Sequence, residues 1–327
     1  MNMPEITDHH NGIIQVKISM SFPLRWVNSY VLQGPEGLTI IDPGPHTPEN
    51  EEEWNRAFAE IGRTISDVKH IVLTHHHPDH LGCSGWIQQQ SGCKVWMSER
   101  SYQETRLMWG PDSTMNSDLP ELFRSHGMPA EWTDQLEVHM NSFVPQVTPS
   151  PEVSFIPMGQ HLVMGGREWM PVETAGHAPG HVSFYHEESG EILCGDAVLP
   201  QISPNVSLTP GSDPEPLQSF LKGLLKLKNL EVSTAYPGHR NPFKHFGERL
   251  EALLLHHEER LVKIEQMLDS APATGFKLCV SLFSSKLGIH QMRFAMCETL
   301  AHTRELERRG RVTSFRNKDD IICYKMK

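Results

Sequence analysis

The sequence predicts an α/β protein, and three observations lead to this fold class. Short apolar runs with strand character alternate with segments of helical spacing along the first two thirds of the chain. Several of these predicted strands end in loops that place histidine or aspartate beside glycine. The length of 327 residues is about twice that of a typical domain, so we expect an α/β body followed by a second domain.

The N-terminal part contains the first predicted elements in order. Apolar and polar residues alternate over 12–20, 28–33 and 38–41, which predicts three strands. The third strand ends in the turn Asp42-Pro43-Gly44-Pro45. Asp42 either ties this turn to nearby backbone or to a histidine that orients a metal site, or it is a plain turn residue. Helical spacing over 51–61 then predicts a helix.

The segment from Thr74 to His80 is the most informative stretch of the sequence. An apolar strand over 68–73 leads into it, and its residues His75, His77, Asp79 and His80 form the pattern H-x-H-x-D-H. Neutral imidazole and carboxylate are good ligands for divalent ions such as zinc. His75 and His77 can converge on one ion, while Asp79 and His80 point toward a second. A surface cluster of histidines is the alternative interpretation.

Three later loops repeat this arrangement. Predicted strands at 169–174, 191–194 and 233–236 are followed by Gly176-His177-Ala178-Pro179-Gly180-His181, by Gly195-Asp196 and by Pro237-Gly238-His239. Each loop puts a ligand-type residue just after a strand, beside a glycine that permits a tight backbone path. One such loop is weak evidence, but four in one α/β chain predict a site for two metal ions at one sheet edge.

Residues 98–151 differ from the rest of the body. This segment is rich in methionine, tryptophan and other apolar residues and is interrupted by proline and glycine, which favours short helices inserted between core elements. Such an insertion can form a lid or a substrate channel. It can equally pack onto the body without any role in catalysis.

Composition and charge narrow the class of protein. The chain is 38% hydrophobic and 21% charged, lacks an apolar stretch of the about 20 residues that span a membrane, and shows no signal-peptide core, so we expect a cytoplasmic protein without membrane attachment. Its six cysteines form no C-x-x-C pair, which predicts buried, reduced thiols, with a metal-binding role open for Cys83 alone. From Arg240 onward, 16 basic residues face 11 acidic ones, whereas the preceding part holds 13 and 29. This asymmetry favours two domains, and the acidic body should repel nucleic acid.

Together these motifs resemble those of the metallo-β-lactamase superfamily in order and in local sequence. The match covers roughly residues 12–245. It implies an αββα sandwich of two mixed sheets with helices outside, which would make residues 1–245 the catalytic domain with 98–151 as its insertion. It further implies the ligand set: His75, His77 and His177 for the first ion, Asp79, His80 and His239 for the second, and Asp196 bridging both. His181 is expected to support these ligands rather than to bind metal.

In the C-terminal part, residues 246–327, helical patterns over 246–268, 278–283 and 291–307 precede two predicted strands, 311–314 and 321–324. This order of elements resembles the winged-helix domain of the lactamase-B-like metallohydrolases. Five basic residues gather around these strands: Arg308, Arg309, Arg311, Arg316 and Lys318. They could contact nucleic acid, but the adjacent Asp319 and Asp320 and the lack of an aromatic ladder favour a solvated wing packed on the catalytic domain.

Two ions with these ligands predict a hydrolase. A water that bridges them loses a proton near neutral pH, and Asp79 or Asp196 would orient the resulting hydroxide. Zinc is the expected metal, although manganese and iron suit the same ligands. The acidic body and the apolar insertion favour a small acyl substrate such as a thioester. The alternatives are an endoribonuclease acting on single-stranded RNA and a non-enzymatic nucleic-acid-binding regulator, and the oligomeric state stays open.

Overall fold

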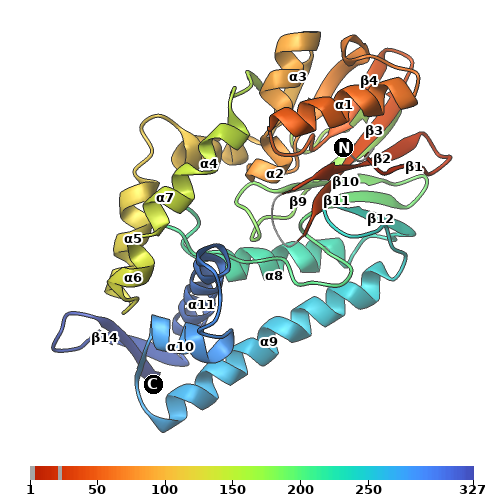
Figure 1. Ribbon diagram of the computed structural model, residues 1–327. Coiled ribbons are helices and arrows are strands. Elements are labelled where there is room, and N and C mark those ends of the chain that lie inside the picture. The colour runs from red at the N-terminus through yellow and green to blue at the C-terminus, as the bar shows by residue number, and fades with distance from the viewer. Residues whose placement is uncertain (1–3, 21–23) are drawn as a thin grey trace.

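The computed structural model describes residues 4–20 and 24–327 and shows two β-sheets packed face to face (Figure 1). Residues 1–3 and 21–23, which fall within the predicted catalytic domain, lie outside the described residues. The first sheet has the strand order β1 (Ile6–Asp8), β2 (Ile13–Ser19), β3 (Trp26–Gly34), β4 (Gly37–Ile41), β5 (Val68–Val72), β6 (Lys94–Met97) and β7 (Val153–Phe155). Its strands pair antiparallel from β1 to β4 and parallel from β4 to β7.

The second sheet runs in the order β12-β11-β10-β9-β8. Its strands are β8 (Leu162–Met164), β9 (Arg167–Glu173), β10 (Val182–His186), β11 (Glu191–Gly195) and β12 (Thr234–Pro237). Only the β11–β12 pair within this sheet is parallel, and the others are antiparallel. Because β9 and β11 both run antiparallel to β10, strands β9, β11 and β12 all end at the same edge of the sheet.

The alternation of side chains along the strands builds three apolar layers. In β3, Tyr30 and Leu32 pack between the two sheets, whereas Val31 points to the outer face, as the pleat of a strand requires. Helix α1 (Pro48–Glu60) covers that outer face with Trp54 and Phe58. Helices α8 (Pro216–Leu227) and α9 (Phe246–Ser270) cover the outer face of the second sheet. The result is a mixed α/β sandwich with helices on both sides, as the sequence predicts (Figure 1).

Residues 98–151 form short helices that pack on the C-terminal part. They are α4 (Glu99–Trp109), α5 (Met115–Ser125), α6 (Ala130–Thr133), α7 (Leu136–Asn141) and the 3-10 helix η2 (Val144–Val147). Leu119, Phe123 and Met140 share one buried cluster with Met292 and Met296 of α11 (Ile289–Arg308). We call this set the shared cluster. It joins two segments that are far apart along the chain.

The C-terminal part contains a third, small sheet. After α9 follow β13 (Ala273–Thr274), α10 (Gly275–Leu282), α11, β14 (Val312–Arg316) and β15 (Ile322–Met326), with strand order β13-β15-β14. Helix α9 has 25 residues, about 37 Å at 1.5 Å per residue, so it packs on both the sandwich and the C-terminal helices. The division between residues 245 and 246 therefore stays a prediction.

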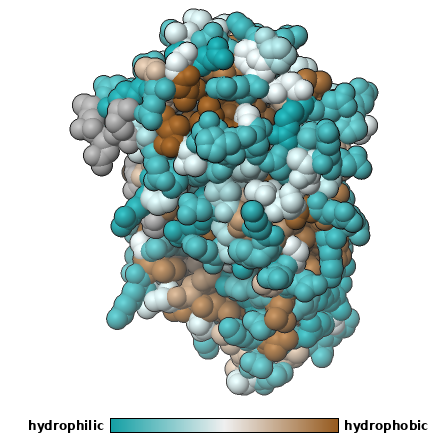
Figure 2. Space-filling model, turned by 90° about the vertical axis from the view of Figure 1, so that its right-hand side faces the viewer, coloured by the Kyte–Doolittle hydropathy of each residue, from teal (hydrophilic) through white to brown (hydrophobic). Residues whose placement is uncertain are grey.

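The remaining helices of the described chain are short. Helix η1 (Ile65–Asp67) precedes β5, while α2 (Pro78–Leu81) and α3 (Ser84–Ser91) follow it. Among the described helices, none is long and apolar enough to cross a bilayer. On the face seen in Figure 2, polar residues predominate and apolar residues form separate patches. All six cysteines are buried and unpaired, as expected.

Candidate metal centre

The four loops singled out in the sequence meet at one edge of the sandwich. In the first sheet, the loop after β5 carries His75 and His77, and helix α2 directly after it carries Asp79 and His80. In the second sheet, the loops after β9, β11 and β12 carry His177, Asp196 and His239. Three groups of potential ligands form there, and within each group the ligand atoms lie within 4.8 Å of one another. Two of them share no residue and are described first, and the third, Asp42, His75 and His80, takes one histidine from each. The ends of strands from both sheets thus build one site.

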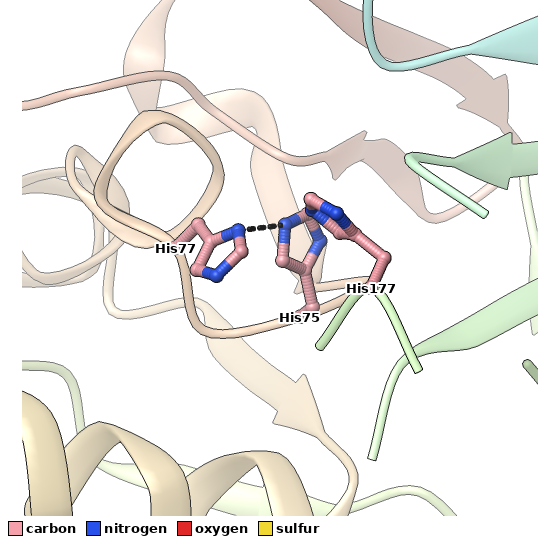
Figure 3. A group of neighbouring side chains, drawn as sticks. All are labelled: His75, His77 and His177. Carbon is pink, nitrogen blue, oxygen red and sulfur yellow. Dashed lines mark hydrogen bonds between the residues drawn. The ribbon is translucent and has the colours of Figure 1, made fainter. Parts of the chain in front are cut away.

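His75, His77 and His177 form the first group (Figure 3). The Nε2 atom of His75 lies 3.0 Å from the Nδ1 atom of His77, and the ring of His177 approaches both from the second sheet. Burial lowers the pKa of all three histidines, and the neighbouring histidines lower those of His75 and His77 further. These rings are therefore neutral at neutral pH and can offer lone pairs to a cation.

Asp79, His80 and His239 form the second group. The Nε2 atom of His239 lies 3.2 Å from Asp79 Oδ2, and that of His80 lies 3.7 Å from the same oxygen. Burial would lower the pKa of His239, but Asp196 and Asp79 outweigh it and raise this pKa to about 10. The pKa of His80 is raised for the same reason. A divalent cation would take the place of the protons that these carboxylates hold on the rings.

Asp196 lies between the two groups. Its Oδ2 atom is 3.5 Å from His177 Nε2 in the first group, and 3.6 Å and 3.4 Å from the Nε2 atoms of His80 and His239 in the second. Three buried atoms at this centre have no hydrogen-bond partner among the described residues, namely His80 Nε2, His177 Nε2 and Asp196 Oδ1. Because buried polar atoms are normally paired, these orphaned donors and acceptors fit a centre that takes up cations.

Hydrogen bonds from Nδ1 to backbone carbonyl groups fix the orientation of His177 and His239. His177 donates its Nδ1–H to the carbonyl oxygen of Asn205 at 2.8 Å, and His239 donates its Nδ1–H to that of Trp26 at 3.1 Å. A carbonyl can only accept, so both rings must carry the proton on Nδ1 and leave Nε2 for a metal. No local pattern in the sequence marks the Asn205 carbonyl as a partner of His177.

Asp42 performs the same task for His80. Its Oδ2 atom lies 2.9 Å from His80 Nδ1 and accepts a hydrogen bond of 2.6 Å from the Thr74 hydroxyl, while its Oδ1 accepts from the Thr74 backbone N–H at 2.8 Å. The Thr74 hydroxyl in turn lies 2.9 Å from His75 Nδ1. Asp42 therefore acts on one histidine of each group, and its side chain is buried.

His181 lies beside the centre but is occupied at both ring nitrogens. Its Nδ1 is 2.8 Å from the Thr174 hydroxyl, and its Nε2 accepts the backbone N–H of Asp196 at 3.1 Å. In this arrangement His181 holds the Asp196 backbone. Cys83 also stays apart, since its thiol donates to the Pro45 carbonyl and the residue belongs to none of the ligand groups formed by the described residues.

The glycines beside the ligands are required by close contacts. A Cβ atom on Gly195, whose φ is +47°, would lie 2.7 Å from His181 Nε2. A Cβ atom on Gly238 would lie 2.3 Å from Asp196 Oδ1. Side chains at these positions would displace the central carboxylate or the histidine that supports its backbone.

A cavity of about 550 Å³ opens beside the centre. Its lining includes Asp79, His177 and Asp196, apolar residues of the 98–151 segment such as Trp109 and Phe143, and residues of α11. Sequence reasoning assigned the lining role to the 98–151 segment alone. The participation of α11 follows from the fold, which brings it against that segment through the shared cluster.

Comparisons with known proteins agree with this architecture. The family model described as metallo-beta-lactamase superfamily matches residues 24–239, and one described as metallo-beta-lactamase-like, C-terminal domain, matches 261–327. A probable metallo-hydrolase of Bacillus subtilis, YqjP, is 27% identical over 96% of this chain and 98% of its own length. A metallo-beta-lactamase family protein from Thermus thermophilus superposes with a TM-score of 0.85 at 32% identity, covering 97% of this chain and 99% of its own. A beta-lactamase domain protein from Burkholderia ambifaria superposes with a TM-score of 0.89 at 26% identity, covering 100% and 96%. The chain therefore belongs to the metallo-beta-lactamase superfamily and has a metallo-beta-lactamase-like C-terminal domain.

Proposed function

We propose that the protein is a hydrolase that uses two divalent metal ions to cleave a thioester or another activated acyl bond. The observation that carries the proposal is the position of Asp196 Oδ2 between the two ligand groups. This oxygen lies within 3.6 Å of the Nε2 atom of His177 in the first group and of the Nε2 atoms of His80 and His239 in the second. His75, His77 and His177 would hold one ion, and Asp79, His80 and His239 the other. Asp196 would contact both.

The chemistry follows from the ligands and from the residues that hold them. Two divalent ions, when bound, lower the pKa of a water molecule and polarise an acyl oxygen. Zinc suits this nitrogen and oxygen donor set best, and manganese and iron also fit. Asp79 is half-buried and lines the cavity, so we assign it the transfer of a proton between the centre and the substrate. Asp196 is more deeply buried and keeps the two ligand groups together.

The cavity supports an acyl substrate. Its apolar wall includes Met108, Trp109 and Leu119 from the 98–151 segment and Phe283 and Leu287 from the C-terminal part. Such a surface suits an acyl chain better than a polyanion. Two more distant relatives point the same way by name: a hydroxyacylglutathione hydrolase, GloC, of Haemophilus influenzae, 25% identical over 171 residues, and an atrochrysone carboxyl ACP thioesterase of Aspergillus fumigatus, 24% identical over 259 residues.

We further propose that the C-terminal part, with its helices and three-stranded sheet, is a winged helix with a structural role. Four of its five clustered basic residues are paired within the same region: Arg308 with Glu305, Arg309 with Glu258 and Glu305, Arg311 with Glu265, and Arg316 with Asp320. Paired arginines release fewer counterions from a phosphate backbone. This pairing disfavours the RNA-cleaving and regulatory alternatives.

The proposal is tested by metal analysis and a substrate screen. Elemental analysis of gently purified protein should find close to two divalent ions per chain, and at most one tightly bound ion would contradict the two-metal assignment. The metal-loaded protein is then assayed on acyl thioesters, lactones and short single-stranded RNA, with Asp79→Ala as the matched inactive control. RNA cleavage that exceeds ester turnover and disappears in Asp79→Ala would replace the acyl substrate by RNA.

A further inference from the structure

Arg293 is a cation in the wall of the cavity that opens onto the metal centre. It lies on α11 and lines the same space of about 550 Å³ as Asp79, His177 and Asp196. The residue is half-buried. Neither the ligand set nor the proposed proton transfer uses it.

The surroundings of Arg293 are aromatic and aliphatic rather than acidic. Its guanidinium lies 4.3 Å from the ring centroid of Phe294 and 5.3 Å from that of Phe143, and its Nη1 is 3.1 Å from the sulfur of Met140. Its Nε atom is buried and has no hydrogen-bond partner within residues 4–20 and 24–327. These apolar contacts provide no acceptor for the Nε–H of the guanidinium.

The titratable neighbours of Arg293 do not offset its charge. Burial, followed by the charge of Arg293, lowers the pKa of His139 to about 4 and that of His290 to about 3, so both rings are neutral at neutral pH. Burial also lowers the pKa of Arg293 itself to about 10, which leaves it protonated. A partly dehydrated cation without a counter-charge is unfavourable for the free protein.

Each acidic residue of the cavity wall is already engaged elsewhere. Glu104 pairs with Arg100 at 2.5 Å, and Glu298 pairs with Arg260. Asp79 and Asp196 face the histidines of the metal centre. Among the ion pairs of the described residues none includes Arg293, and the sequence has no Asp or Glu at 1–3 or 21–23.

We propose that Arg293 binds a negatively charged group of the substrate, a carboxylate or a phosphate, while the acyl group lies at the metal centre. The guanidinium fork offers two parallel N–H groups, which match both anions. The apolar wall between would take a short methylene chain. This inference rests on the proposed function and narrows its substrate class to anionic acyl thioesters, with the anion on either the acyl or the thiol side.

Turnover of matched thioesters tests the assignment. The acyl-side set pairs the N-acetylcysteamine thioesters of succinate, glutarate and adipate with the neutral butyryl, valeryl and hexanoyl thioesters, and the thiol-side arm uses the butyryl thioester of 3-mercaptopropionate. The readout is the ratio of kcat/KM for an anionic substrate to that for its neutral counterpart. Arg293→Met keeps the side-chain bulk and should lower this ratio by about 10–100-fold, mainly through KM, since hydrogen bonds to charged groups contribute at this level. Whichever arm shows the drop identifies the side that carries the anion.

A control and a binding measurement separate this inference from the proposed function. Arg304 lies on the same helix but outside the cavity wall. The control variant Arg304→Met should therefore leave the ratio of anionic to neutral kcat/KM at its wild-type value. Calorimetry on the metal-loaded protein then compares glutarate with neutral glutaramide, and Arg293→Met should weaken glutarate binding about 10-fold or more. If no thioester is cleaved but this loss appears, the proposed function fails and the anion site stands. If thioesters are cleaved but neither the ratio nor glutarate binding depends on Arg293, the residue is a packing element and the inference is wrong.

Discussion

Replacement of Asp42 by asparagine tests whether its hydrogen bonds orient the histidines of the metal centre. In the protein, Asp42 accepts three hydrogen bonds, from the Thr74 N–H at 2.8 Å, from the Thr74 hydroxyl at 2.6 Å and from His80 Nδ1 at 2.9 Å. Asparagine keeps the size and one acceptor, but its NH₂ group replaces the oxygen that faces His80 and the hydroxyl. His80 Nδ1–H then meets a donor, which favours the tautomer with the proton on Nε2.

The expected magnitude follows from these contacts. A histidine with its proton on Nε2 cannot bind a metal through that atom, and loss of such orienting partners typically weakens metal binding by about 10–100-fold, or about 1.4–2.8 kcal/mol. The hydroxyl of Thr74 also lies 2.9 Å from His75 Nδ1, so the substitution should weaken the binding of both ions rather than of one. The buried donors left without an acceptor should lower the free energy of unfolding by about 1–3 kcal/mol each.

Competition with a chromogenic chelator measures both metal affinities in each variant. Thr74→Val is the matched control, because it removes the link to His75 while Asp42 still accepts from His80. We expect Asp42→Asn to weaken both sites and Thr74→Val to weaken only the one that includes His75. Two ions bound to Asp42→Asn with wild-type affinity would refute the tautomer argument.

Three further predictions follow from the same contacts. Asp196→Ala should abolish turnover, whereas His181→Ala should cost about 10–100-fold; a worse effect of His181→Ala with loss of an ion would show that His181 rather than His177 is the ligand. Glu298→Ala removes the carboxylate that holds Asn205, whose backbone carbonyl accepts a hydrogen bond from His177. The same chelator titration should then show about 10-fold weaker metal binding at the site that includes His177, and Glu298→Gln should be closer to wild type. Burial lowers the pKa of His302 to about 3, so only the unfolded state takes up a proton at this residue as the pH falls below 6.5. At pH 5 this proton uptake should lower the free energy of unfolding by about 2 kcal/mol. In urea unfolding, His302→Gln should therefore reduce the loss of stability between pH 7 and pH 5 by that amount.

The ligand positions could be predicted because their signals are local. Each of the seven residues stands no more than eight positions after the end of a strand, and strand patterns can be recognised from short apolar runs. Helix α8 also has a local signal, because Leu217, Phe220, Leu224 and Leu227 follow helical spacing and are all buried. The sequence analysis does not include it among the predicted helices. Strand β10, by contrast, is buried on both faces and includes Ser183 and His186, so neither alternation nor a continuous apolar run marks it.

Contacts between distant segments left no comparable trace. Asn205 orients His177 through its backbone carbonyl and is held by Glu298, which is 93 residues away along the chain. A backbone acceptor carries no side-chain signature, so sequence alone cannot assign it. Arg293 is similar, because its isolation from acidic residues appears only once α11 is placed against the cavity.

The shared cluster has a consequence for how the cavity admits its substrate. Because α5 and α7 bury Leu119, Phe123 and Met140 against Met292 and Met296 of α11, the 98–151 segment cannot swing outward alone without exposing this apolar surface to water. The C-terminal part is held in the same way, because Ala301 and Leu306 of α11 are buried in one cluster with residues of α8, α9 and the second sheet. We therefore expect the substrate to enter through rotamer changes of the side chains along the cavity wall, on the picosecond to nanosecond scale, rather than through the opening of a helical lid.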